Sequence, residues 1–231
     1  MDQPDVDPAH LDDCLDQLAR LSVLSGARRL IWDRARSLLP ADGPVTLVDV
    51  GAGGGDILRH LSRGLGDRLR LGVGLDFHER TAMAGARRST GHGRLRFARA
   101  DARALPLAPR SADLVMMHMA LHHIEPRDRA AVLAELGRVS RGAVLVTDLA
   151  RNALNRVGAR ILTATVWRRN PLMRVDAPVS VDRSLTSSEF ASLAAEAGLG
   201  VVRITSLYGH RLALSAHAPA RAEVGGGATP A

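Results

Sequence analysis

The sequence predicts an α/β fold in which a mostly parallel sheet carries helices on both faces. Short runs of branched aliphatic residues alternate with longer stretches whose apolar residues recur at helical spacing, which is typical of strand–helix–strand units. With 231 residues, of which 46% are hydrophobic, the chain is large enough for one domain with a sizeable core. Aromatic residues make up only 3%, so we expect that core to be aliphatic.

Two helices are expected before the first strand. Residues 9–21 and 25–39 carry apolar side chains at helical spacing, and Pro40 and Gly43 end the second helix. The single cysteine, Cys14, falls in the first helix. It excludes an internal disulfide and is interpreted as a half-buried helix residue.

Strands and helices then alternate regularly up to residue 150. We expect strands at 45–50, 68–76, 94–101, 112–121 and 142–150, and helices at 56–65, 79–89 and 126–140. Thr186 or Ser187 is expected to cap a later helix that has Glu189 in its first turn. Two apolar runs within 201–216 are interpreted as an antiparallel pair of strands.

Residues 151–185 interrupt this alternation. They combine a basic amphipathic stretch with Asn-Pro and Ala-Pro pairs, which are turn signals. One helical face of the stretch collects Leu154, Val157, Ile161, Thr165 and Arg168. We expect the segment to cover the substrate and to be mobile without ligand; an ordinary surface helix is the alternative.

The remaining parts of the chain give the domain organisation. Residues 1–40 are expected to cover the binding site, and residues 41–216 to form the main domain, with 151–185 as its insertion. The tail, residues 217–231, is rich in Gly, Ala and Pro and is expected to be disordered. No run of 18 apolar residues occurs and the N-terminus is acidic, so we expect a cytoplasmic protein without a membrane-spanning segment.

The net charge of +7 raises the question of a nucleic-acid partner. All 31 basic residues are arginine, and they are spread along the chain without a basic stripe that carries aromatic residues for base stacking. Nucleic acid is therefore a disfavoured partner.

A glycine-rich loop follows the first expected strand, in the segment Asp49-Val50-Gly51-Ala52-Gly53-Gly54-Gly55. Dinucleotide-binding loops need a third glycine where this chain has Asp56. The carboxylate of Asp49 would repel a pyrophosphate and attract a cation such as an amino group. The loop is thus suited to a nucleoside that lacks phosphates and carries positive charge.

This segment resembles the first motif of the class I S-adenosylmethionine-dependent methyltransferases, an acid followed by a glycine-rich loop. Asp76 ends the second expected strand, where the family's acid binds both ribose hydroxyls, and Asp101 ends the third, where its acid binds the adenine amino group. The resemblance covers about residues 45–150 and the last helix and strands. It implies S-adenosylmethionine as cofactor and a Rossmann-like sheet of seven strands with an antiparallel last strand.

The resemblance also implies which residues contact the cofactor. They are Asp49, Gly51, Ala52, Gly53, Gly55, Asp76, Phe77, Asp101, Ala102, Met117 and His118.

The residues after the fourth strand bear on the methyl acceptor. Leu121-His122-His123 stands where methyltransferases that act on nucleic-acid bases carry an Asn/Asp-Pro-Pro-aromatic motif. The run is similar to the ubiquinone/menaquinone-type and bacterial polyketide-associated small-molecule methyltransferases. That similarity implies methyl transfer to an oxygen or carbon of a small phenolic, quinone or polyketide-like acceptor.

Three histidines, His118, His122 and His123, are the candidate catalytic residues. A phenol or an acidic ring carbon loses a proton as it is methylated, and histidine can accept a proton near neutral pH. Purely structural histidines are the alternative, and no metal site is expected from them. In the cover, Arg151, Trp167 and Arg174 are candidate substrate residues.

Other functions are left open by the sequence. They are an RNA-modifying methyltransferase, a lipid-quinone methyltransferase at the membrane surface without stable insertion, and a non-catalytic cofactor-binding scaffold. A homodimer is also left open.

Overall fold

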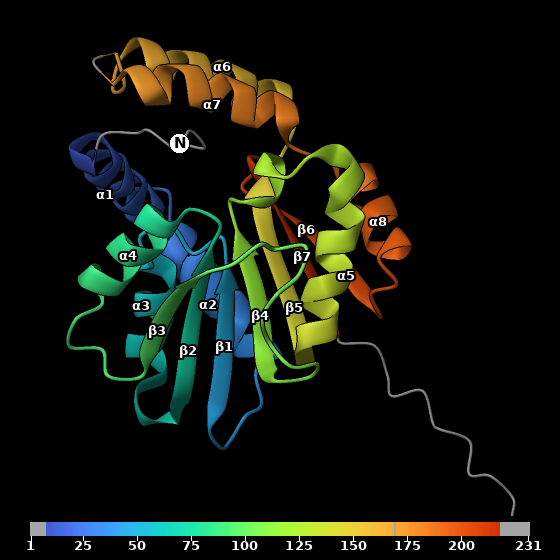
Figure 1. The fold of residues 1–231 in the computed structure, drawn as a ribbon. Helices are drawn as coiled ribbons and strands as arrows, with labels where there is room; N and C mark the ends of the chain where they lie inside the picture. Colours follow the sequence, from blue (N-terminus) through green and yellow to red (C-terminus); the bar gives the residue numbers. More distant parts are fainter. Residues whose placement is uncertain (1–7, 169, 218–231) are drawn as a thin grey trace, which may run out of the picture.

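A computed structural model describes residues 8–168 and 170–217. Its strands form one sheet in the order β3-β2-β1-β4-β5-β7-β6. Every pair from β3 to β5 is parallel, and β7 runs antiparallel to both of its neighbours (Figure 1). The strands are β1 (Val45–Val50), β2 (Leu69–Asp76), β3 (Leu95–Arg99), β4 (Ala112–His118), β5 (Ser140–Leu149), β6 (Val202–Leu207) and β7 (Arg211–His217). The predicted fold class is confirmed.

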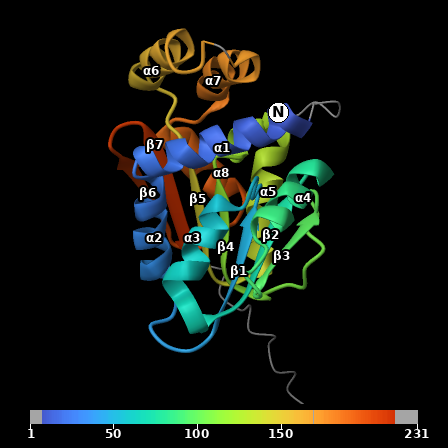
Figure 2. The same cartoon turned by 90° about the vertical axis from the view of Figure 1, so that its left-hand side faces the viewer.

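Helices cover both faces of this sheet. One face carries α2 and α3, and the other carries α5 and α8, while α4 packs on β2 and β3 (Figures 1 and 2). The α-helices are α1 (Pro8–Leu24), α2 (Ala27–Leu38), α3 (Asp56–Leu65), α4 (Glu79–Arg88), α5 (Arg129–Val139), α6 (Ala153–Ala164), α7 (Pro171–Arg183) and α8 (Ser187–Glu196). Short 3₁₀ turns are η1 (Gly66–Arg68), η2 (Leu121–His123) and η3 (Pro126–Asp128).

The strands are apolar on both sides because helices cover both sides. In β1, Leu47 packs into the core under α2 and α3, whereas Val48 and Val50 face the core under α5 and α8. This alternation follows from the two-residue period of a strand. As expected, the core is mainly aliphatic, with Phe190 among its few fully buried aromatic side chains.

The expected caps hold α8 in place. Thr186 accepts from the backbone N–H of Glu189, and the Glu189 carboxylate accepts from the backbone N–H of Thr186 at 2.8 Å. This capping box fixes the point at which the chain returns from the insertion to the sheet.

The insertion forms a hairpin of two helices, α6 and α7, above the carboxyl edge of the sheet (Figure 1). Asn152 and Asn170 cap them, and Pro171 occupies the first turn of α7, where its missing N–H costs nothing. The expectation of a turn at the Ala-Pro pair was wrong, because Pro178 lies inside α7. Burial of Met173 and Val181 outweighs the helix-breaking tendency of proline, which is roughly 3 kcal/mol.

The last strand extends one residue into the expected tail. His217 still belongs to β7, so the boundary expected for the tail is one residue early, and residues 218–231 lie outside the described part. Within residues 8–168 and 170–217, no helix is both long and apolar enough for a bilayer crossing.

Candidate functional site

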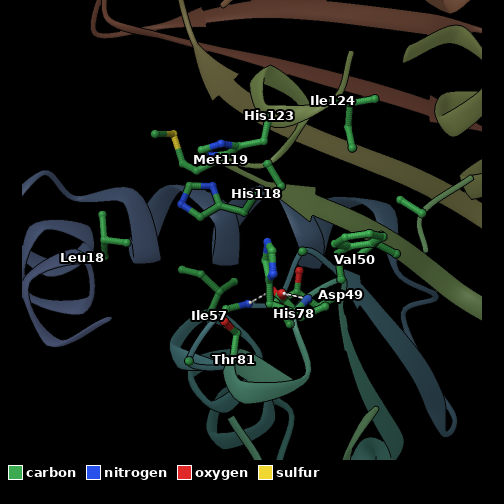
Figure 3. Close-up of a pocket in the computed structure, with 18 of the residues that line it drawn as sticks. Leu18, Asp49, Val50, Ile57, His78, Thr81, His118, Met119, His123 and Ile124 are labelled. Carbon is green, nitrogen blue, oxygen red and sulfur yellow. Dashed lines mark hydrogen bonds between the residues drawn. The ribbon is translucent and has the colours of Figure 1, made fainter. Parts of the chain in front are cut away.

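A cavity of about 580 Å³ opens at the carboxyl edge of the sheet (Figure 3), and helix α1 lies over this edge (Figure 2). The size of the cavity falls in the usual range for small-molecule sites, roughly 300–1,000 Å³. It lies where the strand order reverses between β1 and β4, which is the point where open α/β sheets bind ligands. Helix α1 contributes the apolar side chains Leu15, Leu18 and Leu21 to its wall.

The glycine loop forms the floor of one end of the cavity. The backbone N–H groups of Gly51 and Ala52 donate to the carbonyl of Leu75, at 2.8 and 3.0 Å, and so hold the loop against β2. Gly51 has a φ of 73°, and an added Cβ would lie 2.5 Å from the Cβ of Ala120. Only glycine fits there.

Two residues of the predicted cofactor set serve packing instead of lining the cavity. Gly55 precedes α3, and an added Cβ would collide with Phe97 at 2.5 Å. Met117 is 1% exposed and belongs to the core under α5 and α8. Its side chain points away from the cavity because alternate residues of β4 face opposite sides of the sheet.

Asp49 is a buried carboxylate whose Oδ1 atom has no hydrogen-bond partner among the described residues. Burial raises the pKa of Asp49 well above its ordinary value, and the negative charges of Asp56 and Asp76 raise it further. Such a carboxylate is suited to a cationic ligand group, which can donate a hydrogen bond to it and neutralise its negative charge. The ammonium group of a methionine moiety meets this requirement.

Asp76 and Asp101 lie in the same cavity wall, as the strand ends predict. Asp76 accepts from the backbone N–H groups of Gly53 and His78, each at 3.0 Å, so it joins the glycine loop to the end of β2. Hydrogen bonds from Arg103 lower the pKa of Asp101, and the closest joins Nη2 to Oδ2 at 2.6 Å. Both carboxylates thus present acceptor oxygens beside the loop.

Phe77 and Ala102, the neighbours of these acids in the chain, also line the cavity. Phe77 is 53% exposed, and the guanidinium of Arg99 lies 5.9 Å from its ring centre. A flat apolar surface between two carboxylates is suited to a purine nucleoside.

The three histidines occupy different places. His118 and His123 line the cavity, and Figure 3 shows both near Met119. The Nδ1 atom of His118 lies 2.6 Å from the hydroxyl of Thr147. Burial, and after it the positive charge of Arg211, lower the pKa of His118 to about 3, so the ring is neutral over the physiological range.

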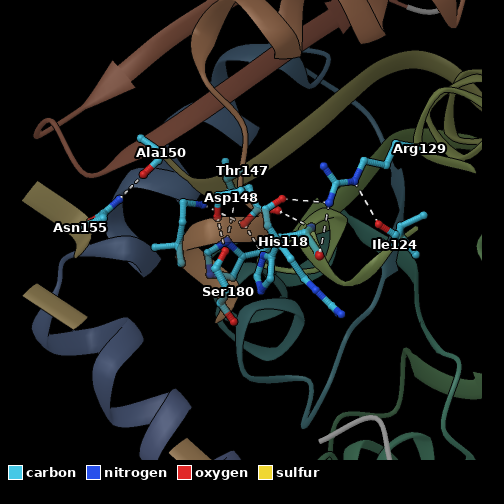
Figure 4. Close-up of polar contacts among 12 residues, drawn as sticks. His118, Ile124, Arg129, Thr147, Asp148, Ala150, Asn155 and Ser180 are labelled. Atoms are coloured by element: carbon cyan, nitrogen blue, oxygen red, sulfur yellow. Dashed lines mark hydrogen bonds and ion pairs between the residues drawn. The ribbon is translucent and has the colours of Figure 1, made fainter. Parts of the chain in front are cut away.

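His122 is buried behind the cavity wall and is not among the residues that line it. Its Nδ1 atom lies 2.6 Å from Oδ1 of Asp148, and its backbone N–H donates to Oδ2 of the same carboxylate at 3.0 Å (Figure 4). Burial alone would raise the pKa of Asp148, but His122 and the backbone N–H groups outweigh it and lower that pKa. The pair holds η2 against the end of β5.

The predicted substrate residues lie elsewhere. Arg151 pairs with Glu189 on α8, Arg174 is exposed on α7, and Trp167 packs in a small cluster with Cys14 and Met173. None of the three lines the cavity. Trp167 instead fastens the α6–α7 hairpin to α1.

Arg183 and Arg211 also line the cavity. Neither of these arginines was predicted from the sequence. Arg129 donates to the carbonyl of Arg183 at 2.8 Å and so fixes the end of α7 beside the site. Arg211 opens β7 and is 5% exposed. In a chain with 31 arginines, no local signal marks these two.

The chain is similar to known methyltransferases in sequence over part of its length and in fold. Residues 47–143 match a family model described as a methyltransferase domain. No curated protein matches the sequence. Among solved structures, a SAM-dependent methyltransferase from Aquifex aeolicus shares 16% identity with a TM-score of 0.68, and the match covers 93% of this chain and 100% of that one.

Two further structures carry additional domains or segments. The CurJ carbon methyltransferase shares 14% identity with a TM-score of 0.68, covering 93% of this chain and 62% of its own. An O-methyltransferase family protein from Burkholderia thailandensis shares 21% identity with a TM-score of 0.64, covering 90% of this chain and 59% of its own.

Proposed function

We propose that this protein, a class I S-adenosylmethionine-dependent methyltransferase, methylates an oxygen or carbon of a small phenolic, quinone or polyketide-like acceptor. The enzyme class and the cofactor predicted from the sequence are confirmed by the methyltransferase-domain match and the shared fold. The acceptor class rests on one observation. The cavity that carries the acids and the glycine loop continues past β4 to an end lined by His118, His123, Arg183 and Arg211.

The cofactor end of the cavity has candidate acceptors for the ammonium group, the ribose hydroxyls and the adenine of S-adenosylmethionine. Asp49 supplies the unpartnered carboxylate for the ammonium group, and Asp76 supplies two acceptor oxygens for the ribose hydroxyls. Asp101 and Ala102, which line the cavity with Phe77, would bind the adenine. When bound, the cofactor supplies an electrophilic methyl group on a sulfonium centre.

The protein's own contribution at the acceptor end is to position the acceptor and exclude water. The wall formed by α1 closes the cavity from above with leucine side chains. A neutral His118, held by Thr147, can hydrogen-bond to an acceptor oxygen without adding charge. Of the three histidines, His118 and His123 are the ones placed to touch an acceptor.

The relatives with named chemistry are consistent with this range of acceptors. One is described as a carbon methyltransferase and another as an O-methyltransferase family protein. Transfer to oxygen and transfer to carbon both need an electron-rich acceptor atom aligned with the methyl group, so positioning is common to the two.

The test is transfer of a labelled methyl group from S-adenosylmethionine to a panel of phenols, hydroxyquinones and 1,3-dicarbonyl compounds. We expect labelled, solvent-extractable product with at least one of these classes. Label that appears only in RNA, when total RNA is added in parallel, would contradict the proposal. Steep loss of RNA binding with salt would identify phosphate contacts in that case.

The surface of α6 favours a second candidate function, the methylation of a lipid-soluble quinone at a membrane surface. Leu154, Val157 and Ile161 are 59%, 52% and 57% exposed, so the predicted apolar stripe faces solvent and not the cavity. Arg156 and Arg160 lie on the same helix. An exposed apolar stripe with arginines beside it is typical of helices that rest on anionic lipid, and it would give access to a lipid-soluble quinone. Co-sedimentation with anionic vesicles, lost in Ile161→Asp and retained in Thr163→Asp, is the expected result.

A further inference from the structure

Arg211 is a cationic side chain of the cavity wall that is buried and has no ion-pair partner among the described residues. It is 5% exposed, and its Nε and Nη1 atoms have no hydrogen-bond partner among the described residues. Its third nitrogen, Nη2, donates to the Ser25 hydroxyl at 3.3 Å. A guanidinium carries five N–H donors in a planar fork, so the N–H groups on Nε and Nη1 are unsatisfied in a side chain that lines the cavity.

The surrounding groups do not neutralise it. The negative charge of Asp148 on β5 acts on it, but that carboxylate already accepts from His122 and from the backbone of Leu149. His118 on β4 is neutral, and Arg183 at the end of α7 adds a second positive charge to the same wall. This part of the cavity wall therefore carries the two positive charges of Arg183 and Arg211, with Glu125 as an acidic neighbour in the lining.

The sheet order places Arg211 on the acceptor side. Arg211 begins β7, which lies three strand positions from β1 and two from β4. At about 4.8 Å per position, its backbone is roughly 14 Å from the strand that carries Asp49. The ammonium and carboxylate groups of a methionine moiety are attached to one carbon, so a cofactor whose ammonium binds Asp49 keeps its carboxylate closer to the β1 backbone than to the β7 backbone.

We propose that Arg211 is the receptor for a negatively charged oxygen of the methyl acceptor, either an ionised phenol or enol or a carboxylate. This inference rests on the proposed methyltransferase function and narrows its substrate class to anionic acceptors. A phenol or enol bound in this way has its oxyanion stabilised by the guanidinium. It reaches the methyl group already deprotonated, and its proton is released to solvent on binding.

The experiment uses 4-nitrophenol as the probe, with the protein saturated with S-adenosylhomocysteine. Absorbance of the nitrophenolate during a pH titration reports the pKa of the bound probe directly. In the wild type we expect the bound probe to ionise at a lower pH than the free probe. In Arg211→Met the bound pKa should return to the free value or above, with affinity for the ionised probe reduced about 10- to 100-fold.

Three comparisons isolate the charge. Arg203→Met removes an exposed arginine on the neighbouring strand and should leave the probe's affinity and pKa unchanged. Binding of 4-nitroanisole, the neutral ether, should be the same in wild type and Arg211→Met. Arg211→Lys keeps the charge and should retain part of the pKa shift. A parallel titration with 4-nitrobenzoate then tells which oxyanion, carboxylate or phenolate, binds more tightly.

Stability and cofactor affinity separate this role from a structural one. Removing a buried unpaired charge should leave the unfolding midpoint of Arg211→Met unchanged or higher, because the desolvation penalty is removed with it. S-adenosylhomocysteine affinity should also be unchanged. The proposal is overturned if cofactor affinity falls with Arg211→Met, if probe binding is the same in both proteins, or if the wild type binds neither anion at millimolar concentration. Failure of the wild type to bind S-adenosylhomocysteine would instead reject the proposed function itself.

Discussion

The two ends of the cavity differ in their charged side chains, aspartates at one end and two arginines at the other, and they are built differently. At the cofactor end, Asp49, Asp76 and Asp101 each stand within two residues of the end of a strand, and the glycine loop after β1 donates hydrogen bonds to Leu75 of β2. At the acceptor end, His118, Arg183 and Arg211 come from β4, α7 and β7. One end depends on backbone geometry and neighbouring strand ends, whereas the other depends on how distant elements pack. Substitutions should therefore affect the two ends independently.

The largest effect is expected at the acidic end. Asp76→Ala should weaken S-adenosylhomocysteine binding by about 2–4 kcal/mol, because two charge-assisted hydrogen bonds to the ribose are lost at roughly 1.5–3 kcal/mol each and water recovers a part. Titration calorimetry measures this loss of affinity. Asp67→Ala, which removes an exposed carboxylate paired with Arg94, is the matched control. Unchanged affinity in Asp76→Ala would show that the ribose is bound elsewhere.

Asp148→Asn tests the support of the basic end. Asparagine keeps one acceptor oxygen where Asp148 accepts from the imidazole and backbone of His122 and from the backbone of Leu149. We expect the free energy of unfolding to fall by about 2–3 kcal/mol, since buried donors are left unsatisfied. Chemical denaturation checks this. Asp182→Asn, in an exposed pair with Arg156, should change stability little.

The same carboxylate predicts a pH effect on stability. Its pKa is lowered in the folded protein, so its contribution is present above the unfolded-state pKa of 3.8 and is lost as the pH falls through the folded value. The difference in stability between wild type and Asp148→Asn should therefore shrink as the pH is lowered below about 4. A constant difference from pH 7 to pH 3 would contradict this assignment.

Asp49→Asn sharpens the comparison because it should change stability and affinity in opposite directions. The folded-state pKa of Asp49 is raised, so the native protein becomes less stable as the pH rises from 3.8 through that folded value. Without cofactor, Asp49→Asn should be more stable than the wild type near neutral pH. Its affinity for S-adenosylmethionine should fall by about 1.5–3 kcal/mol, the contribution of a hydrogen bond to a charged group. A loss of both stability and affinity would mean that Asp49 is a structural residue.

A smaller effect is expected for the histidine in the cavity. His118→Gln should lower kcat less than tenfold, because an imidazole with a pKa of about 3 is a weak general base at neutral pH. The pH profile of kcat should then follow the acceptor and not the enzyme. A loss of 100-fold or more, with cofactor affinity unchanged, would assign proton transfer to His118.

The smallest perturbation concerns the α6–α7 hairpin. Hydrogen exchange in 153–164 should be faster than in β5, because α6 exposes its apolar residues while β5 is buried and paired on both edges. We expect exchange to slow when cofactor and acceptor bind together. Uniformly slow exchange in the free protein would make the hairpin a rigid part of the scaffold.

The cofactor end was predictable because its determinants are local. A run of aliphatic residues followed by Gly51 indicates a strand that ends in a turn. An acid at the end of a parallel strand lies at the carboxyl edge of the sheet, independently of the other segments of the chain. The placement of Asp49, Asp76 and Asp101 in one cavity wall follows from strand alternation alone.

The acceptor end was not predictable in the same way. Arg151 and Arg174 are candidate substrate residues because they lie in the inserted segment. The faces that α6 and α7 turn toward the site, however, are set by packing of Trp167 and Met173 against α1. Arg211 reaches the cavity only because β7 lies between β5 and β6, a pairing that no short stretch of sequence encodes. Pro178 shows the same limit, since tertiary packing overrode its local preference.

The position of β7 also has a consequence for synthesis on the ribosome. The edge of β5 has no strand beside it until β7 has been made, and β6, which precedes β7 in the chain, cannot join the sheet without it. The nascent chain therefore carries an open, apolar strand edge after the cofactor-binding strands have emerged, and such edges recruit other chains. Ribosome-bound intermediates that end before Arg211 should bind S-adenosylmethionine while still depending on chaperones to keep β5 from aggregating.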